Sequence, residues 1–109
     1  MELDELKLAW QSLDRQMDQR YALDLADRAA RKMGWDIVAL VPEQGRIEAT
    51  ASTLLFGFKD DVVIRITPEA GGSRVDMRSV SRVGGSDIGA NARRIRAFMK
   101  ELQAQQRAG

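Results

Sequence analysis

The chain of 109 residues contains neither cysteine nor histidine. Without cysteine it has no disulfide, no thiolate nucleophile and no thiolate site for zinc or an iron–sulfur cluster. Without histidine it lacks the commonest general base and the commonest nitrogen ligand of metals. These absences exclude most familiar active-site designs, so we expect a non-catalytic protein with no metal site and no cofactor.

Long apolar runs and a large charge of one sign are also missing. The longest apolar stretches, such as residues 37–41, fall far short of the roughly 20 residues that span a bilayer. The first residues are acidic, unlike the basic flank of a secretory signal. The sequence as written therefore predicts no membrane insertion and a cytoplasmic location. Its net charge of +1 does not favour a nucleic-acid partner.

The composition is that of one soluble globular domain, with 44% apolar and 30% charged residues. The charge is uneven along the chain. Residues 1–27 carry three bases and seven acids, a net −4, whereas residues 73–109 carry eight bases and three acids, a net +5. The two ends are therefore complementary in charge.

The N-terminal part of the chain has the apolar spacing of a helix. Five residues step by 3, 4, 3 and 4 along it, as on one face of a helix: Leu3, Leu6, Trp10, Leu13 and Met17. We expect a helix over residues 3–33 that ends at Gly34, and we treat residues 1–20 as a helical extension of the domain.

After residue 34 the apolar period changes to about 2 and turn residues recur, as in an antiparallel meander. The expected strands are 35–41, 46–54, 61–67 and 74–82, followed by a helix over 87–105 and a frayed tail at 106–109. Residues 21–105 then form a single α+β domain of order α-β-β-β-β-α, with both helices on one face of a four-stranded sheet.

The apolar stripe of the extension is longer than a small sheet can cover. A stripe from residue 3 to residue 17 measures about 21 Å at 1.5 Å per residue, and an exposed stripe of this kind favours association. We therefore expect a homo-oligomer, in the simplest case a dimer, formed through Leu3, Leu6, Trp10, Leu13 and Met17. The alternative is that the helix folds back on its own domain.

Three short segments carry a family resemblance: residues 58–61 (FKDD), 76–82 (DMRSVSR) and 86–95 (SDIGANARRI). Together with the surrounding sequence from about residue 25 to residue 102, they resemble the bacterial domain-of-unknown-function family 1499. The resemblance implies no particular activity. Residues 1–20 look unrelated to the family pattern, as in a natural variant or a chimera.

The strand at 74–82 alternates, so that Val75, Met77, Ser79 and Ser81 share one face and the arginines share the other. The polar face has two interpretations. Either it is a ladder of cross-strand ion pairs that includes Arg65 and Asp76, which we favour, or its arginines bind a phosphate or carboxylate ligand. The residues that would bind such an anion are Arg65, Arg78, Arg82 and, at the start of the last helix, Ser86.

Other polar residues of the resembling segments are expected to hold the fold together. Asp60 and Asp61 are adjacent, so they point to opposite sides of a strand and cannot form a close carboxylate pair. We expect the two to pair with Arg93 or Arg94. The remaining members of this polar network are Asp76, Asp87 and Asn91.

These observations favour an interaction module that self-associates or docks a partner through its N-terminal helix. The alternative is a domain that binds a small anionic ligand through Arg65, Arg78 and Arg82. The bases of the last helix are scattered around it without exposed aromatic residues, which does not favour nucleic-acid binding.

The ion-pair interpretation predicts the effect of Arg78→Ala. Asp76 and neighbouring carboxylates can pair with this arginine. Its loss should therefore cost more free energy of unfolding, seen as a lower melting temperature, than free energy of anion binding. Thermal unfolding and anion titration of the same variant check this. An unchanged melting temperature with lost anion binding would contradict the ion-pair interpretation.

Overall fold

The computed structural model describes residues 5–11, 19–52, 59–69, 72–82 and 88–108. Its elements, in chain order, are β1 (Glu5–Gln11), α1 (Gln19–Lys32), β2 (Asp36–Val41), a 3₁₀ turn η1 (Pro42–Gln44), β3 (Arg46–Ser52), β4 (Lys59–Glu69), β5 (Gly72–Ser81) and α2 (Ile88–Ala108). From α1 onward the order is α-β-β-β-β-α. The α+β fold class expected from the sequence is confirmed, with four successive antiparallel strands between two helices.

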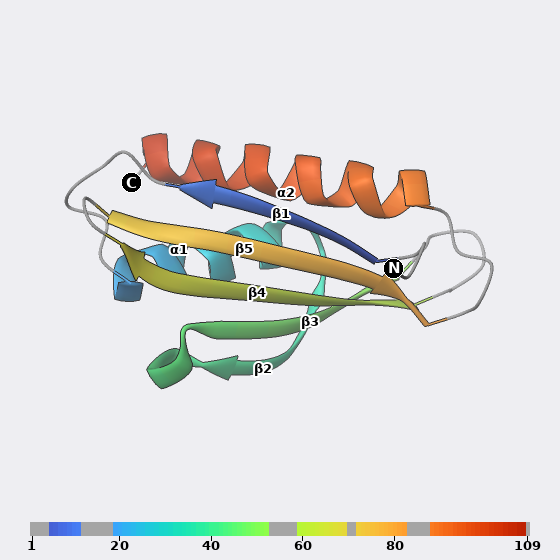
Figure 1. Ribbon diagram of the computed structural model, residues 1–109, viewed down its shortest axis with the longest axis horizontal. Helices are drawn as coiled ribbons and strands as arrows, with labels where there is room; N and C mark the ends of the chain where they lie inside the picture. The colour runs from blue at the N-terminus through green and yellow to red at the C-terminus, as the bar shows by residue number, and fades with distance from the viewer. Residues whose placement is uncertain (1–4, 12–18, 53–58, 70–71, 83–87, 109) are drawn as a thin grey trace.

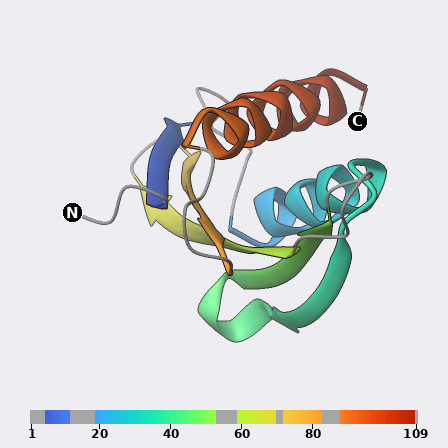
Figure 2. The same ribbon diagram turned by 90° about the vertical axis from the view of Figure 1, so that its right-hand side faces the viewer.

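The strands form one antiparallel sheet in the order β1-β5-β4-β3-β2. The sheet curves around the two helices, which lie on the same side of it and leave its other face uncovered (Figures 1 and 2). The expectation that both helices cover one face is therefore confirmed. The result is a two-layer domain with one buried and one open sheet face.

The prediction of a helix over residues 3–33 is wrong for residues 5–11, which form strand β1. This strand runs antiparallel to β5, in a register that places Leu6 opposite Ser79 and Trp10 opposite Val75. Leu6, Leu8 and Trp10 also recur at every second residue, so the segment fits a strand as well as a helix. Pairing with the free edge of β5 decides in favour of the strand, because it satisfies the backbone of both segments.

The expected helical extension is corrected accordingly, whereas the expected homo-oligomer stays a prediction. Leu6 and Trp10 lie on a strand of the chain's own sheet, whereas Leu3, Leu13 and Met17 lie outside the described residues. No continuous helical stripe is therefore available for pairing with a second chain. The tail is also shorter than expected, because α2 continues to Ala108.

Helix α1 packs on the sheet through an alanine-rich face that allows close approach. Its buried residues are Ala22, Leu23, Leu25, Ala26, Ala29 and Ala30. The helix ends as expected at Gly34, which has a left-handed φ of 84°. The N–H of Gly34 donates to the carbonyl of Arg31, and that of Trp35 donates to the carbonyl of Ala30, so the last carbonyls of the helix are satisfied.

The core is closed where the two helices meet the sheet. Helix α2 buries Asn91, Ile95, Phe98 and Leu102, which are spaced as one helical face. The ring of Phe98 stacks on that of Trp35, with centroids 5.5 Å apart and planes inclined by 19°. This aromatic pair joins the C-terminal helix to the segment that leads from α1 into β2.

The turn into β3 requires a glycine. Gly45 has a φ of 61°, and its N–H donates to the carbonyl of Pro42. Its carbonyl accepts from the N–H of Ile66 at 2.7 Å. A Cβ atom at this position would collide with the Ile66 carbonyl and with the side chain of Gln19, so a larger residue would separate α1, β3 and β4.

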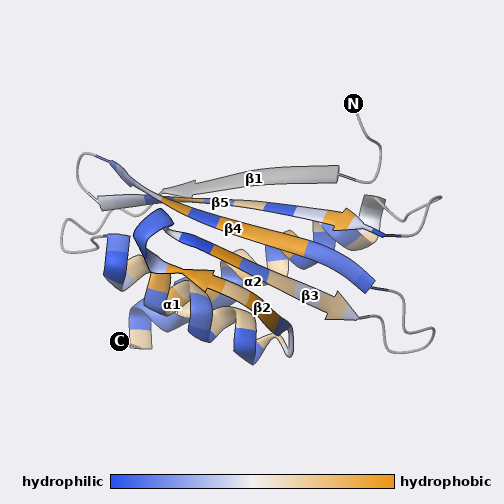
Figure 3. Cartoon of the chain, turned by 90° about the horizontal axis from the view of Figure 1, so that it is seen from below, coloured by the Kyte–Doolittle hydropathy of each residue, from blue (hydrophilic) through white to orange (hydrophobic). Residues whose placement is uncertain are grey.

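Burial alternates along the central strands β4 and β5, in which hydrophobic and hydrophilic residues are interspersed (Figure 3). On β4, Val62, Ile64 and Ile66 are buried beneath the helices, and on β5 Val75, Met77 and Ser79 occupy the same face. This is the assignment of faces that the sequence predicted. Neither described helix contains an apolar stretch long enough to cross a membrane.

Proline substitutions in β1 distinguish a strand from a helix. In an edge strand, alternate N–H groups point to the neighbouring strand and to solvent, so Leu8→Pro and Ala9→Pro should have unequal effects. We expect the variant that loses a hydrogen bond to β5 to be less stable by about 2–3 kcal/mol, and the other to be milder. Chemical denaturation measures both, with Leu8→Ala as the control for the lost side chain. Equal losses in the two proline variants would contradict the strand.

Candidate functional site

Two polar clusters lie at the same end of the sheet, on its opposite faces. They begin at neighbouring residues of β4, because Asp60 is buried on the helix side and Asp61 is exposed on the open side. The sequence argument that these carboxylates cannot form a close pair is thereby confirmed. We refer to the clusters as the inner network and the outer cluster.

The inner network is centred on a buried ion pair. The Nη1 atom of Arg94 on α2 lies 2.7 Å from Oδ2 of Asp60, and the two side chains are only 12% and 8% exposed. The same nitrogen donates to Oδ1 of Asn91 at 2.8 Å and to Oγ of Ser79 at 3.1 Å. The sequence predicts that Asp60 and Asp61 both pair with Arg93 or Arg94. The structure pairs Asp60 with Arg94, whereas Asp61 points to the open face and pairs with Arg82, so the expectation is wrong for Asp61.

Asn91 completes the network between the helix and β5. Its Oδ1 accepts from the hydroxyl of Ser79 at 2.7 Å, and its Nδ2 donates to the hydroxyl of Ser81 at 3.1 Å. Asn91 and Ser79 are fully buried. The amide thus ties the beginning of α2 to the end of β5, as the sequence predicted for this residue.

The inner network has the chemistry of a group that stabilises the packing of α2 on the sheet. A buried charge is tolerated only when it is paired and hydrogen-bonded, and here the carboxylate of Asp60 is used in binding Arg94. The hydroxyl of Ser79 donates to an amide oxygen, which is not a base that could activate it. In the part of the chain that the structure describes, no group of three or more acidic residues is arranged to hold a metal ion.

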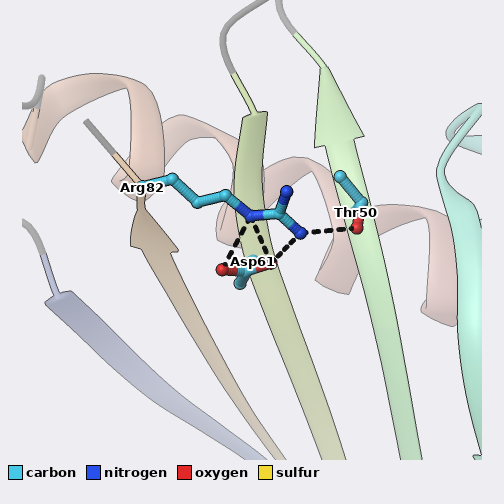
Figure 4. A network of polar contacts seen from close by, with 3 residues as sticks. All are labelled: Thr50, Asp61 and Arg82. Carbon is cyan, nitrogen blue, oxygen red and sulfur yellow. Dashed lines mark hydrogen bonds and ion pairs between the residues drawn. The ribbon is translucent and has the colours of Figure 1, made fainter.

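The outer cluster joins three strands by an exposed, bidentate ion pair (Figure 4). The Nε atom of Arg82 donates to both carboxylate oxygens of Asp61 at 2.9 and 3.0 Å, and Nη2 donates to Oδ1 at 2.7 Å. Nη2 also approaches the hydroxyl of Thr50 on β3 at 3.4 Å. The hydrogen bond and the charge of Asp61 raise the pKa of Arg82 above its ordinary value. Arg82 is therefore already bound to a carboxylate.

Further along the open face, the arginines differ in their pairing. Arg74 lies 3.2 Å from Asp76 and 3.8 Å from Glu69. Arg46 lies 3.1 Å from Glu48. Arg65 is exposed and forms no ion pair with any residue that the structure describes. Arg82 and Asp61 form a cross-strand pair of the expected kind. The predicted pair of Arg65 with Asp76 is wrong, because Arg74 of the same strand binds Asp76 instead.

The remaining predicted site residues fall into two groups. Arg78 is exposed on the open face of β5, in the neighbourhood that the sequence assigned to it, whereas Ser86 and Asp87 lie outside the described residues. Sequence reasoning did not assign Ser79, Ser81 and Thr50 to these clusters. The signal for the two serines was available, because they continue the buried alternation of Val75 and Met77 with polar side chains.

The protein belongs to the structural class of two-layer α+β domains, with two helices on one face of an antiparallel sheet. Within that class, residues 5–102 match the model of a family described as a protein of unknown function, DUF1499, and the chain belongs to this family. The resemblance drawn from the sequence is confirmed. The match includes β1, so residues 5–20 belong to the family segment, and the interpretation that they are unrelated to it is wrong.

A solved structure has the same overall fold. The crystal structure of protein CV1439 from Chromobacterium violaceum is similar to this chain with a TM-score of 0.66 at 11% sequence identity. The similarity covers 93% of this chain and 96% of that one. No curated protein matches the chain.

The buried ion pair predicts a large difference in stability between two arginine variants of α2. Arg94→Ala leaves the buried Asp60 carboxylate without its partner and should cost about 3–5 kcal/mol. Arg96→Ala, on the exposed side of the same helix, should change the free energy of unfolding by about 0.5 kcal/mol or less.

Urea denaturation measures both variants, together with the double variant Asp60→Asn/Arg94→Ala. The double variant should regain part of the lost stability, because no uncompensated charge remains buried. If Arg94→Ala were as stable as Arg96→Ala, the ion pair would not tie the helix to the sheet.

Proposed function

We propose that the protein is a non-catalytic binding module whose open sheet face holds a small anionic ligand with a phosphate or carboxylate group. The observation that supports this most is the position of Arg65 directly opposite Arg46 in the register of β3 and β4. Like charges directly opposite one another destabilise a sheet. Glu48, 3.1 Å from Arg46, offsets part of this repulsion, and an anion bound between the two guanidinium groups would remove the rest.

Arg65 is suited to bind a ligand because its guanidinium is not used by the fold. It is exposed, and the described residues supply no carboxylate that pairs with it. Arg46, which is half-buried, lies beside Arg65 on β3. Arg78 lies opposite Val63 on β5 and is therefore a diagonal neighbour of Arg65. Diagonal neighbours on one face are within reach of long side chains, and arginine binds planar anions through two parallel hydrogen bonds.

The charge of the open face supports the same interpretation. On β3, β4 and β5 this face and its ends carry six bases and four acids, a net +2, and Asp36 of β2 lowers the sum over β2–β5 to +1. The bases are Arg46, Lys59, Arg65, Arg74, Arg78 and Arg82, and the acids are Glu48, Asp61, Glu69 and Asp76. A local excess of this kind attracts anions even when the whole protein is almost neutral.

The proposed site differs from the set suggested by the sequence. Arg82 is omitted because Asp61 binds it on both carboxylate oxygens. Arg46 enters because it faces Arg65. Its Nε lies 3.1 Å from Glu48 but forms no hydrogen bond with the described residues, unlike the guanidinium of Arg82. Docking through an N-terminal helix is not retained, since residues 5–11 form a strand.

Anion-dependent thermal stability tests the proposal. At constant ionic strength, phosphate or citrate should raise the melting temperature of the native chain relative to chloride, by an amount equivalent to about 2.7 kcal/mol at a ligand concentration 100 times the Kd. Arg65→Gln should abolish this shift. Without anion, this variant should be as stable as the native chain or slightly more so, because it removes a like-charge pair.

Arg82→Gln is the matched control, because it removes an arginine of the same face that already has a carboxylate partner. It should retain the response to anions. The proposal fails if neither phosphate nor citrate stabilises the native chain, or if Arg65→Gln responds as the native chain does.

A further inference from the structure

The solvent side of α2 carries a continuous line of basic residues, here called the basic ridge: Arg93, Arg96, Lys100 and Arg107. All four are exposed. Their spacings of 3, 4 and 7 residues place them within about 60° around the helix axis, since each residue turns the helix by about 100°. The ridge extends about 21 Å at 1.5 Å per residue.

The alignment of the four bases becomes clear only from the structure, which shows that Arg94 is buried and does not belong to the exposed set. In the sequence, the five bases of this helix cover more than one side. Arg94 is buried in the ion pair with Asp60, and the buried residues Asn91, Ile95, Phe98 and Leu102 define the opposite side of the helix. The four remaining bases are therefore aligned and point away from the core.

Three of the four bases of the basic ridge keep a charge that no described neighbouring side chain neutralises. Arg96, Lys100 and Arg107 form no ion pair with any residue in the described ranges. Glu101 is the one acid among residues 88–108. It lies on another side of the helix, where its carboxylate accepts a hydrogen bond from Gln105 at 2.9 Å.

We infer that the basic ridge docks the domain on the surface of an anionic lipid bilayer, at the level of the headgroups. Helix α2 lies on the outside of the molecule along its longest dimension (Figure 1). Because the four side chains lie along one straight line on a convex surface, all of them can reach a single flat plane of negative charge. Electrostatic attraction to acidic headgroups acts on each base near such a plane.

The same geometry disfavours a nucleic acid. The major groove is about 8.5 Å deep, and a helix of about 10–12 Å diameter must stand clear of its domain to enter it. Helix α2 is instead buried on one side from Asn91 to Leu102. Single strands are bound by stacking on aromatic residues, but within residues 19–52, 59–69, 72–82 and 88–108 the exposed large apolar residues are Val38 and Leu40 of β2.

Co-sedimentation with lipid vesicles tests the inference. The full chain should bind vesicles of mixed phosphatidylcholine and phosphatidylserine, but not vesicles of phosphatidylcholine alone. Binding should be lost near 1 M salt, where the screening length falls to about 3 Å. Arg96→Gln/Lys100→Gln should weaken partitioning about fivefold for each charge removed, and so roughly thirty-fold in total.

The matched control is Lys59→Gln/Arg74→Gln, which removes two positive charges from the open sheet face on the other side of the molecule. It should bind the mixed vesicles as the native chain does, and all variants should keep the native melting temperature within a few degrees. Equal weakening by both double variants, no binding to the mixed vesicles, or binding to duplex DNA in place of vesicles would overturn the inference. These outcomes are independent of Arg65 and hence of the proposed anion site.

Discussion

The arrangement of this domain depends on one buried ion pair. Asp60 is the second residue of β4 and Arg94 lies about two turns into α2. The charge of each is tolerated in the interior only because the other is present. Ser79 and Asn91 supply further hydrogen bonds, so the pair can form only when β4, β5 and α2 are all in place. The pair thus fixes the position of α2 along the sheet, and with it the stacking of Phe98 on Trp35 that closes the core. It also explains why FKDD, DMRSVSR and SDIGANARRI, which are separate in the sequence, form one recognisable pattern: each contributes at least one member to the same network.

The alternation of a strand then determines what the neighbouring residues can do. Since Asp60 points inward, Asp61 must point outward, and it meets Arg82 in water rather than in the interior. An exposed pair of this kind contributes little to stability. Its main effect is to occupy Arg82. Arg65 of the same face has no carboxylate partner among the described residues, and its neighbour on β3 is Arg46. The open face therefore has a definite pattern of charge even though no helix covers it.

Much of this could be predicted from the sequence, because periodicity reports burial directly. The faces of β4 and β5, the end of α1 at Gly34 and the role of Asn91 all follow from local spacing and residue type. The strand at residues 5–11 could not be predicted in this way, because Leu6, Leu8 and Trp10 fit a period of 2 while Leu3, Leu6 and Trp10 fit a period near 3.6. The choice between them depends on the free edge of β5, which is a long-range feature. The selection of Arg94 over Arg93 needs the same kind of information, since adjacent helical residues differ by about 100° in direction and only the docked helix shows which one faces Asp60.

The net charge of +1 conceals a separation of roles among the basic residues. Arg74, Arg82 and Arg94 each have a carboxylate within 3.2 Å, so the fold itself uses their charges. Arg46 also lies 3.1 Å from Glu48, and in the proposal it serves both the fold and the anion site. Arg65 on the open sheet face and Arg96, Lys100 and Arg107 of the basic ridge contribute charge that no ion pair of the described residues uses. These two surfaces lie on opposite layers of the molecule (Figure 2), so a ligand on one does not obstruct the other. Unneutralised charge destabilises a compact chain. The concentration of such charge on two separate surfaces is therefore better explained by the binding of external anions than by folding. Where only folding is concerned, the same chain neutralises its arginines with carboxylates.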